Sequence, residues 1–235
     1  MRRVGGLDGC RGGWVLATVG IDERGSAVAD TADVQVISTF AEAVALVTSG
    51  QMAALGVDMP IGLPDAGRRE ADFEARRRLG PRASSVFPTP LRSVLSATDY
   101  PDALLRSRAV DGKGLSKQAF NLLPKMVEVD AAMTPALQDQ VFECHPETAF
   151  VHLAGRPLTT TKREAVGWAE RVDLLATVLG DVTGLADRPP PGAKVDDVLD
   201  ALAVATVATR LVGGRVERLG DGALDARGLR MEIVT

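Results

Sequence analysis

The chain has 235 residues, of which 46% are apolar and 25% charged, and its formal net charge is −4. These proportions exclude a disordered or fibrous protein and fit one large globular domain, or one domain with an inserted subdomain. No uncharged apolar run reaches the ~18 residues of a membrane span, and "MRRVGGLDGC" lacks the apolar core of an export signal, so we expect neither feature.

The first quarter of the chain predicts an α/β pattern with an antiparallel start. Apolar and β-branched residues in short runs indicate strands, and the Gly-rich turn in "RVGGLDGCRGGWVLATVG" joins the first two. Ser38 or Thr39 is a suitable cap for a helix that Gly50 ends. The predicted elements are strands at 4–8, 14–19, 33–38 and 53–58 and a helix at 40–48.

An irregular stretch at about 65–138 follows, and it is too long for a simple connection between strands. It contains a basic helical segment ("READFEARRRLG"), a polar loop ("PRASSVFPTPLR") and a longer helical segment ("SKQAFNLLPKMVEVDAAM"). We therefore predict an insertion, or a functional cap, between the fourth strand and the next one.

Strand character returns in "QVFECH", and helices are predicted from there almost to the end. Pro146 and Gly155 suit the start and the stop of a short helix. An amphipathic helix is expected at 161–180, a linker in "DRPPPGAK", and a mostly apolar helix at 195–214. The tail, "RVERLG" and "LRMEIVT", predicts a final short hairpin.

Positive charge is concentrated between Arg68 and Arg92, where seven arginines face three acids, a local balance of +4. A basic segment on an acidic body suits a polyanionic partner held beside a carboxylate-rich site. The alternative interpretation is a solvated helix face with intrahelical ion pairs.

Carboxylates stand at the ends of apolar elements, where a charge is costly unless something pairs with it. Asp8 ends the first predicted strand, and Asp58 ends the fourth, just before a Pro-rich break. Glu143 lies in the short strand "VFEC". Asp197 and Asp200 share one face of the apolar helix, and Asp200 is surrounded by apolar neighbours.

A divalent metal ion bound between these carboxylates would offset the cost of placing their charges beside apolar elements. Oxygen ligands select hard ions, so the expected cofactor is Mg²⁺ or Mn²⁺, as one or two ions. Two ions ~3.5–4 Å apart can assist phosphodiester cleavage. If the first and fourth strands are parallel neighbours, their ends lie ~4.8 Å apart, which would let Asp8 and Asp58 share ions.

Each acid also has a purely structural interpretation. Asp8 could accept from amides of the Gly-rich turn, and Asp58 could cap its own turn. Glu143 could pair with an arginine of the insertion. The acids at the start of the apolar helix, Asp196 above all, could complement the helix dipole.

The sequence resembles the RNase H-like superfamily, and most closely the family called domain of unknown function 429 (DUF429), described as predicted RNase H-like nucleases. The stretches that carry the resemblance are "GLDGCRGGWV", "VDMPIGLP", "GPRASSVFPTP", "LSKQAFNLLPK", "FECHPE" and "DDVLDALAVA". The last is also similar to the Asp-x-x-Asp-Ala-Leu-Ala helix of RuvC-type resolvases.

The resemblance implies one domain over 1–235: an α/β fold with a mixed five-stranded sheet, its first three strands antiparallel, flanked by helices and carrying a helical insertion after strand four. It implies that Asp8, Asp58, Asp197 and Asp200 bind metal. Glu143 has no counterpart in the RuvC-type branch, although it stands in the narrower family's own motif.

The resulting hypothesis is metal-dependent phosphodiester hydrolysis, with nucleic acid or another phosphate ester as substrate; DNA, RNA and a small phosphate ester all fit. The candidate catalytic residues are Asp8, Asp58, Glu143, Asp197 and Asp200. The candidates for binding phosphate are Arg82, Arg92, Lys117 and Lys125. RuvC-type relatives suggest a homodimer.

Three rival classes remain open. Sugar kinases and actin-like ATPases share the same fold core, and they bind phosphate with an Asp-x-Gly hairpin. The stretch "LDGCRGGW" is loosely similar to that hairpin. A non-catalytic module that binds nucleic acid or protein could keep the acids as a structural remnant. Thiol chemistry at Cys144 is disfavoured, because adjacent strand residues such as Cys144 and His145 point to opposite faces.

Cys10 and Cys144 are too few for a disulfide framework, so we expect a reducing, cytoplasmic setting. Cys144 is expected to be a core residue. Trp14 and Trp168 are expected to be core anchors rather than platforms for stacked bases.

Overall fold

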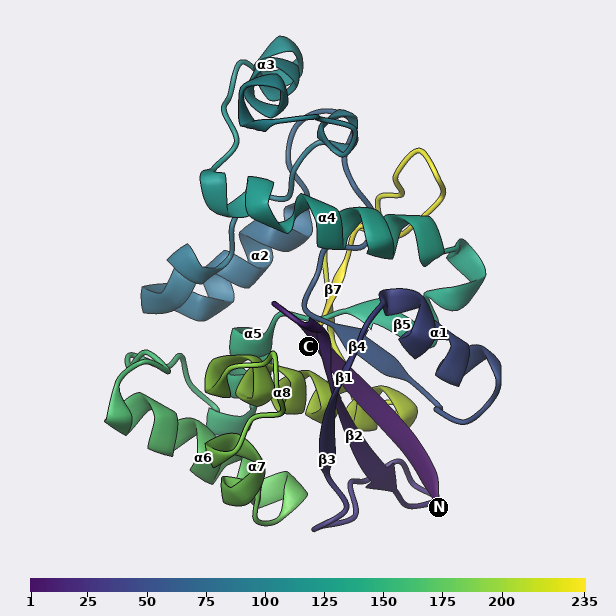
Figure 1. Cartoon of the computed structure of the whole chain (residues 1–235), viewed down its shortest axis with the longest axis vertical. Coiled ribbons are helices and arrows are strands. Elements are labelled where there is room, and N and C mark those ends of the chain that lie inside the picture. The colour runs from purple at the N-terminus through teal and green to yellow at the C-terminus, as the bar shows by residue number, and fades with distance from the viewer.

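Five strands form one mixed sheet in the computed structural model, which describes residues 1–235. The strand order is β3-β2-β1-β4-β5 (Figure 1). The first three strands pair antiparallel, whereas β4 runs parallel to β1 and β5 runs parallel to β4. The strands are β1 (Arg2–Cys10), β2 (Gly13–Ile21), β3 (Asp33–Ile37), β4 (Leu55–Val57) and β5 (Val141–Glu143). The expected mixed sheet with an antiparallel start is confirmed.

The β1–β2 hairpin turns within two residues, because Cys10 pairs with Gly13. Gly13 has a φ of +133°, and a side chain there would bring a Cβ to 2.2 Å from the Ile37 carbonyl oxygen. Only glycine fits this backbone position, so the Gly-rich sequence fixes where the hairpin turns.

Helices cover both faces of the sheet (Figure 1). The helices are α1 (Phe40–Thr48), α2 (Glu70–Leu79), α3 (Tyr100–Asp111), α4 (Lys117–Ala132), α5 (Pro146–Ala154), α6 (Ala165–Leu179), α7 (Thr183–Asp187) and α8 (Val195–Val212). None of them combines the length and the hydrophobicity that crossing a bilayer requires.

The two faces of β2 belong to two separate cores. Val15, Ala17 and Val19 pack in the cluster that contains the apolar side of α8. Trp14 and Leu16 pack in the cluster that contains residues of α1 and α4. This alternation explains why β2 is buried along its whole length and reads as a continuous apolar run.

The chain between β4 and β5 is mostly helical and lies at one end of the molecule, where α2, α3 and α4 gather (Figure 1). It also contains the short 3₁₀ helices η1 (Gly80–Ser85), η2 (Arg92–Val94) and η3 (Pro135–Leu137). The hydrophobic pattern did not predict α3, because this helix buries only Ala103 and Ser107 and exposes Leu105 and Val110. Its capping signals, Asp99 before the helix and Gly112 after it, were present in the sequence.

The tail forms the predicted hairpin. Strands β6 (Arg218–Leu219) and β7 (Ile233–Val234) pair antiparallel as a separate two-stranded sheet. The short helix α7 was not predicted; it ends where the expected linker begins.

Candidate active site

The first and fourth strands bring two of the predicted acids together. Leu7 of β1 is the register partner of Val57 of β4, and the Asp58 amide donates to the Leu7 carbonyl oxygen at 2.9 Å. Asp8 and Asp58 therefore follow paired residues of neighbouring parallel strands, as expected. Asp8 does not end its strand, however: β1 continues to Cys10, and Asp8 lies opposite Val15 in the hairpin.

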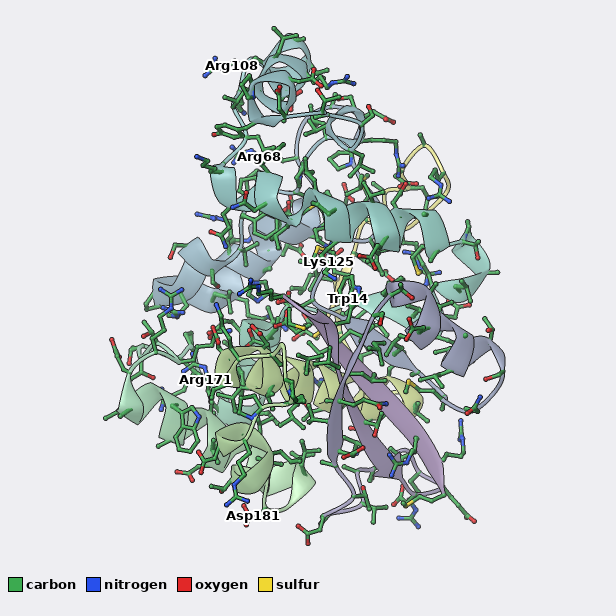
Figure 2. All side chains as sticks on the ribbon, in the orientation of Figure 1. Trp14, Arg68, Arg108, Lys125, Arg171 and Asp181 are labelled. Carbon is green, nitrogen blue, oxygen red and sulfur yellow. The ribbon has the colours of Figure 1, made fainter.

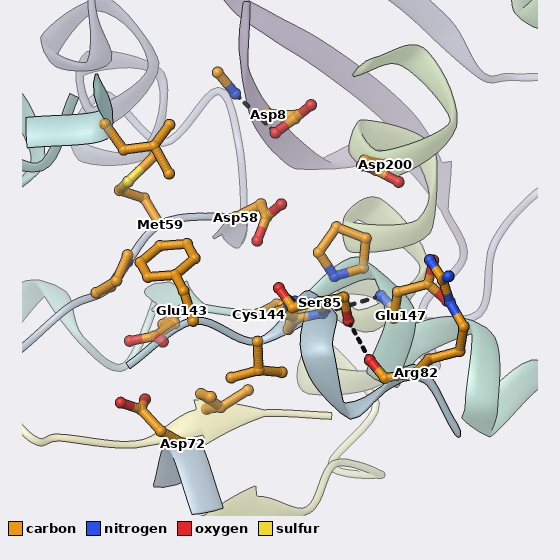
Figure 3. A pocket seen from close by; sticks show the side chains of 18 of the residues that line it. Asp8, Asp58, Met59, Asp72, Arg82, Ser85, Glu143, Cys144, Glu147 and Asp200 are labelled. Atoms are coloured by element: carbon orange, nitrogen blue, oxygen red, sulfur yellow. Dashed lines mark hydrogen bonds and ion pairs between the residues drawn. The ribbon is translucent and has the colours of Figure 1, made fainter. Parts of the chain in front are cut away.

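Helix α8 brings the third acid, because it packs directly on the backbone of β1. A Cβ at Gly6 would lie 2.2 Å from the Ala201 carbonyl oxygen and 2.3 Å from the Ala205 nitrogen. No other residue type allows this approach. The first turns of α8 thus reach the end of β1, and Asp8, Asp58 and Asp200 face a common space (Figure 3).

The three carboxylates perturb one another. Burial raises the pKa of Asp8 well above its usual value, and the charges of Asp200 and Asp58 add to the shift. Burial raises the pKa of Asp58 and that of Asp200 to about 7, although the positive charge of Lys162 opposes both shifts. Acids whose pKa values are displaced by burial and by like charges in a cleft are typical of functional sites.

Lys162 supplies the positive charge of this group, and its role was not predicted. Its Nζ donates to Asp200 in an ion pair that is largely buried. Burial alone would lower the pKa of Lys162, but the charges of Asp200, Asp8 and Asp58 raise it. A lysine in the polar run "TTTKRE" carries no periodicity or spacing that singles it out.

Asp8 and Asp58 otherwise lack strong partners. Asp8 accepts a hydrogen bond at 2.9 Å from the amide of Gly9, within its own turn. The Asp58 side chain forms no hydrogen bond or ion pair with the protein, so it does not cap the turn that follows β4. Both carboxylates are half-buried and line the pocket.

Asp197, the fourth predicted metal ligand, lies differently. Its carboxylate accepts from the Lys194 amide at 2.9 Å and caps the start of α8. Burial raises the pKa of Asp197. The neighbouring Asp196, which the sequence favours as a residue that complements the helix dipole, lines the pocket, whereas Asp197 does not.

Glu143 is held in a buried ion pair with Arg69 of the insertion, as its purely structural interpretation expected. Arg69 donates to its two carboxylate oxygens at 2.6 and 2.7 Å, and the Ile61 amide donates at 2.7 Å. Arg69 also binds Asp72 at 2.6 Å. Figure 3 shows Glu143 and Asp72 on the far side of the pocket from Asp8. The structure therefore does not bring Glu143 into the group of three acids.

A second buried ion pair holds another wall of the pocket. Arg171, whose exposed fraction is 0%, donates to both oxygens of Glu147 at 2.9 Å. Its guanidinium also lies 5.3 Å from the centre of the Phe150 ring. Arg82 lies beside Glu147 (Figure 3), with its Nη2 3.6 Å from the Glu147 Oε1.

Of the four candidates for binding phosphate, only Arg82 lines the pocket. Arg92 is paired with Asp130 and Asp225. Lys125 lies over the Trp14 ring, 4.5 Å from its centre (Figure 2). Lys117 is exposed in the first turn of α4. Arg163, which was not predicted, also lines the pocket.

Trp14 is fully buried and donates from its ring nitrogen to Glu128 at 2.9 Å, which confirms it as a core anchor. Cys144 is fully buried as well, and burial raises the pKa of its thiol. The His145 Nδ1 accepts from the Glu147 amide at the start of α5. These two residues therefore do not form a nucleophile and base pair.

The carboxylate oxygens of the site are chemically suited to a hard cation, but their present positions only partly suit the binding of one ion. Three buried or half-buried carboxylates without arginine partners are suitable ligands for Mg²⁺ or Mn²⁺. As they stand, no three side chains among His, Cys, Asp and Glu surround one ion position. Lys162 takes up one oxygen of Asp200.

The pocket between these walls has a volume of about 550 Å³. Fold and site together define an α/β protein with an acid-lined pocket where two parallel strands meet the start of a buried helix. More particularly, the chain belongs to the family described as protein of unknown function (DUF429), whose sequence profile matches residues 6–224. No curated protein matches the chain.

Proposed function

We propose that this protein is a divalent-metal-dependent phosphodiester hydrolase of the RNase H-like type, acting on nucleic acid or another phosphate ester. The observation that carries the proposal is the convergence of Asp8, Asp58 and Asp200 from β1, β4 and α8 on one pocket. Three carboxylates that share one lysine leave excess negative charge, which a divalent cation would neutralise.

Asp8, Asp58 and Asp200 are the residues that would hold Mg²⁺ or Mn²⁺. When bound, such an ion supplies Lewis-acid chemistry, because it polarises phosphoryl oxygens and lowers the pKa of water. In the hydrolysis, a water oxygen forms a bond to phosphorus, the bond to the leaving ester oxygen breaks, and that oxygen takes up a proton.

The chain's own groups have separable roles in this reaction. Arg82 and Arg163, which line the pocket, would bind nonbridging phosphate oxygens. Lys162 neutralises Asp200 when no other cation is present. The buried pairs Glu143–Arg69 and Glu147–Arg171 hold the walls rigid, which positions the carboxylates.

The test is Mn²⁺-dependent cleavage by the purified protein and by Asp8→Asn, Asp58→Asn and Asp200→Asn. Each variant should lose more than about 100-fold in rate, since even changes outside the ligand shell cost ~10–100-fold in metalloenzymes. Asp173→Asn, at an exposed position of α6, is the matched control and should be unchanged. Cleavage that survives in the purified Asp8→Asn/Asp200→Asn double variant would contradict the proposal.

One observation favours a second candidate, a non-catalytic binding module. Lys162 already gives Asp200 an internal partner, as a structural remnant would have. A module of this kind would bind its ligand equally well with Mg²⁺ and with a chelator, and it would turn over no phosphodiester. Binding measured under both conditions separates the two candidates.

A further inference from the structure

Most of the positive charge of the segment from Arg68 to Arg92 is paired within the protein. Acids pair with most of its arginines: Arg69 with Asp72 and Glu143, Arg77 with Glu70 and Glu74, Arg78 with Glu217, and Arg92 with Asp130 and Asp225. Arg76 donates to the Val86 carbonyl oxygen. Only the pairs of Arg77 lie within one helix, as the alternative of a solvated helix face expected; those of Arg78 and Arg92, and that of Arg69 with Glu143, join distant segments.

This pairing removes most of the positive charge that the segment could offer to a nucleic-acid backbone. Interfaces with duplex DNA bury roughly 1,000–2,500 Å² of protein and are strongly positive, because the backbone is held by unpaired lysines and arginines. The chain as a whole is acidic, with a net charge of −4. A long duplex is poorly matched to this surface.

Inside the pocket, by contrast, two arginines remain available to an anion. The Nε of Arg82 is buried without a hydrogen-bond partner. The acid nearest to Arg82, Glu147, already binds Arg171 through both oxygens. Arg163 forms no ion pair and is exposed at the pocket. Both cations therefore face the space beside the three acids.

The size of the pocket indicates a ligand that enters whole. Its volume of about 550 Å³ falls within the ~300–1,000 Å³ of pockets that enclose small molecules. Its walls come from the sheet on one side and from η1, α4 and the loop after η1 on the other. A duplex does not fit into a pocket of this volume and would have to be bound from outside.

The pocket also has one apolar side. Phe87, half-buried in the loop after η1, lines the pocket together with Leu122 and Met59. In Figure 3, Met59 lies on the opposite side of the pocket from Arg82. One aromatic ring offers a stacking surface for one base, whereas proteins that bind long single strands use successive rings.

We propose that the pocket takes a single phosphodiester of nucleotide size, with its phosphate against Arg82 and Arg163 and its base against Phe87. This inference rests on the proposed hydrolysis and narrows its substrate from a polymer to a small ester. Three observations carry it: the size of the pocket, the exposed Arg163, which forms no ion pair, and Arg82, whose Nε has no hydrogen-bond partner.

The kinetic test compares two substrates with Mn²⁺ present: thymidine 5′-monophosphate p-nitrophenyl ester and a duplex of about 30 base pairs. We expect turnover of the ester, no cleavage of the duplex, and no competition between them.

Arg82→Met and Arg163→Met should each raise KM for the ester about 10-fold or more with little change in kcat, since a charge-assisted bond to phosphate is lost. The exposed, paired Arg77 provides the control, and Arg77→Met should leave both constants unchanged. Cleavage of the duplex, or its competition against the ester, would overturn the inference while leaving the hydrolase proposal intact.

If neither substrate is cleaved, the hydrolase proposal is contradicted. A binding test then still decides whether the pocket takes a ligand of nucleotide size. Thymidine 5′-monophosphate is titrated calorimetrically into the wild type, Arg82→Met and Phe87→Ala. Binding that weakens about 10-fold or more in both variants supports the pocket's ligand class even without turnover. Absence of binding, or binding that is unchanged in both variants, overturns it.

Discussion

Lys162 donates to Asp200 inside the pocket, although 38 residues separate them in the chain. The lysine also acts on Asp58 and Asp8, where its positive charge opposes the rise of both pKa values. It is therefore the internal counterion of the whole group of acids. A metal ion and Lys162 would compete for the same carboxylate.

Replacing this lysine should strengthen metal binding. In Lys162→Met the acids lose the cation that competes for them, so the affinity for Mn²⁺ should rise about tenfold or more at a pH well above 7, where the acids are ionised. Calorimetric titration with Mn²⁺ measures the change, and Lys113→Met, at an exposed loop position, is the control. An unchanged or lower affinity would show that Lys162 supports the ligands rather than competing with the ion.

The metal-free protein should lose stability as pH rises. Asp58 and Asp200 have pKa values raised from 3.8 to about 7, so between these values the folded state binds more protons than the unfolded state. Linkage then requires the free energy of unfolding to fall from about pH 4 to about pH 7 and to level off above it, as far as these groups are concerned. Urea unfolding in a chelating buffer at several pH values measures the slope.

Asp58→Asn removes one of these titrations while nearly preserving shape. The variant should gain stability over the wild type at about pH 8 and gain little at about pH 5, because the wild-type carboxyl is mostly protonated there. A gain that is equal at both pH values would show that charge at Asp58 is not the cause.

The buried pair of Arg69 and Glu143 should be sensitive to loss of the arginine alone. Arg69→Met leaves Glu143 and Asp72 buried without their cation, and removal of one partner of a buried pair costs about 3–5 kcal/mol. Denaturant unfolding gives the value. Arg77→Met breaks an exposed pair on α2 and should cost no more than about 1 kcal/mol.

The contact between β1 and α8 should tolerate no added methyl group. Gly6→Ala places a Cβ 2.2 Å from the Ala201 carbonyl oxygen, so the helix must move away from the strand. We expect a loss of about 3 kcal/mol in unfolding free energy, at the upper end of overpacking effects. Weaker Mn²⁺ binding should accompany it, because Asp200 moves with α8.

Gly184→Ala is the matched control for this substitution. Gly184 lies in α7 with no atom within 4 Å of an added Cβ, and alanine is the better helix former. This variant should be as stable as the wild type or slightly more stable. Equal losses at Gly6 and Gly184 would contradict the role of close packing at Gly6.

Much of the fold and part of the site could be predicted from local patterns. Short runs of apolar and β-branched residues predicted all five strands of the sheet, and the caps and apolar stripes predicted most helices. Helix α3 was not predicted, because its buried face is too small to show a helical period. Asp8, Asp58 and Asp200 could be identified because a charge at the end of an apolar strand or within an apolar helix is anomalous in sequence.

The partners of the acids were decided by the tertiary structure alone. Whether Glu143 meets Arg69 or a metal, and whether Asp200 meets Lys162, depends on segments that lie 74 and 38 residues apart. Charge is a long-range property with no periodicity, so a sequence can show that a buried acid needs a counterion but cannot show which one arrives. The sequence by itself determined the strands, most of the helices and the set of five candidate acids. Packing of α8 and of the helices after β4 around the end of β1 decided which acids face the pocket and which are neutralised in its walls.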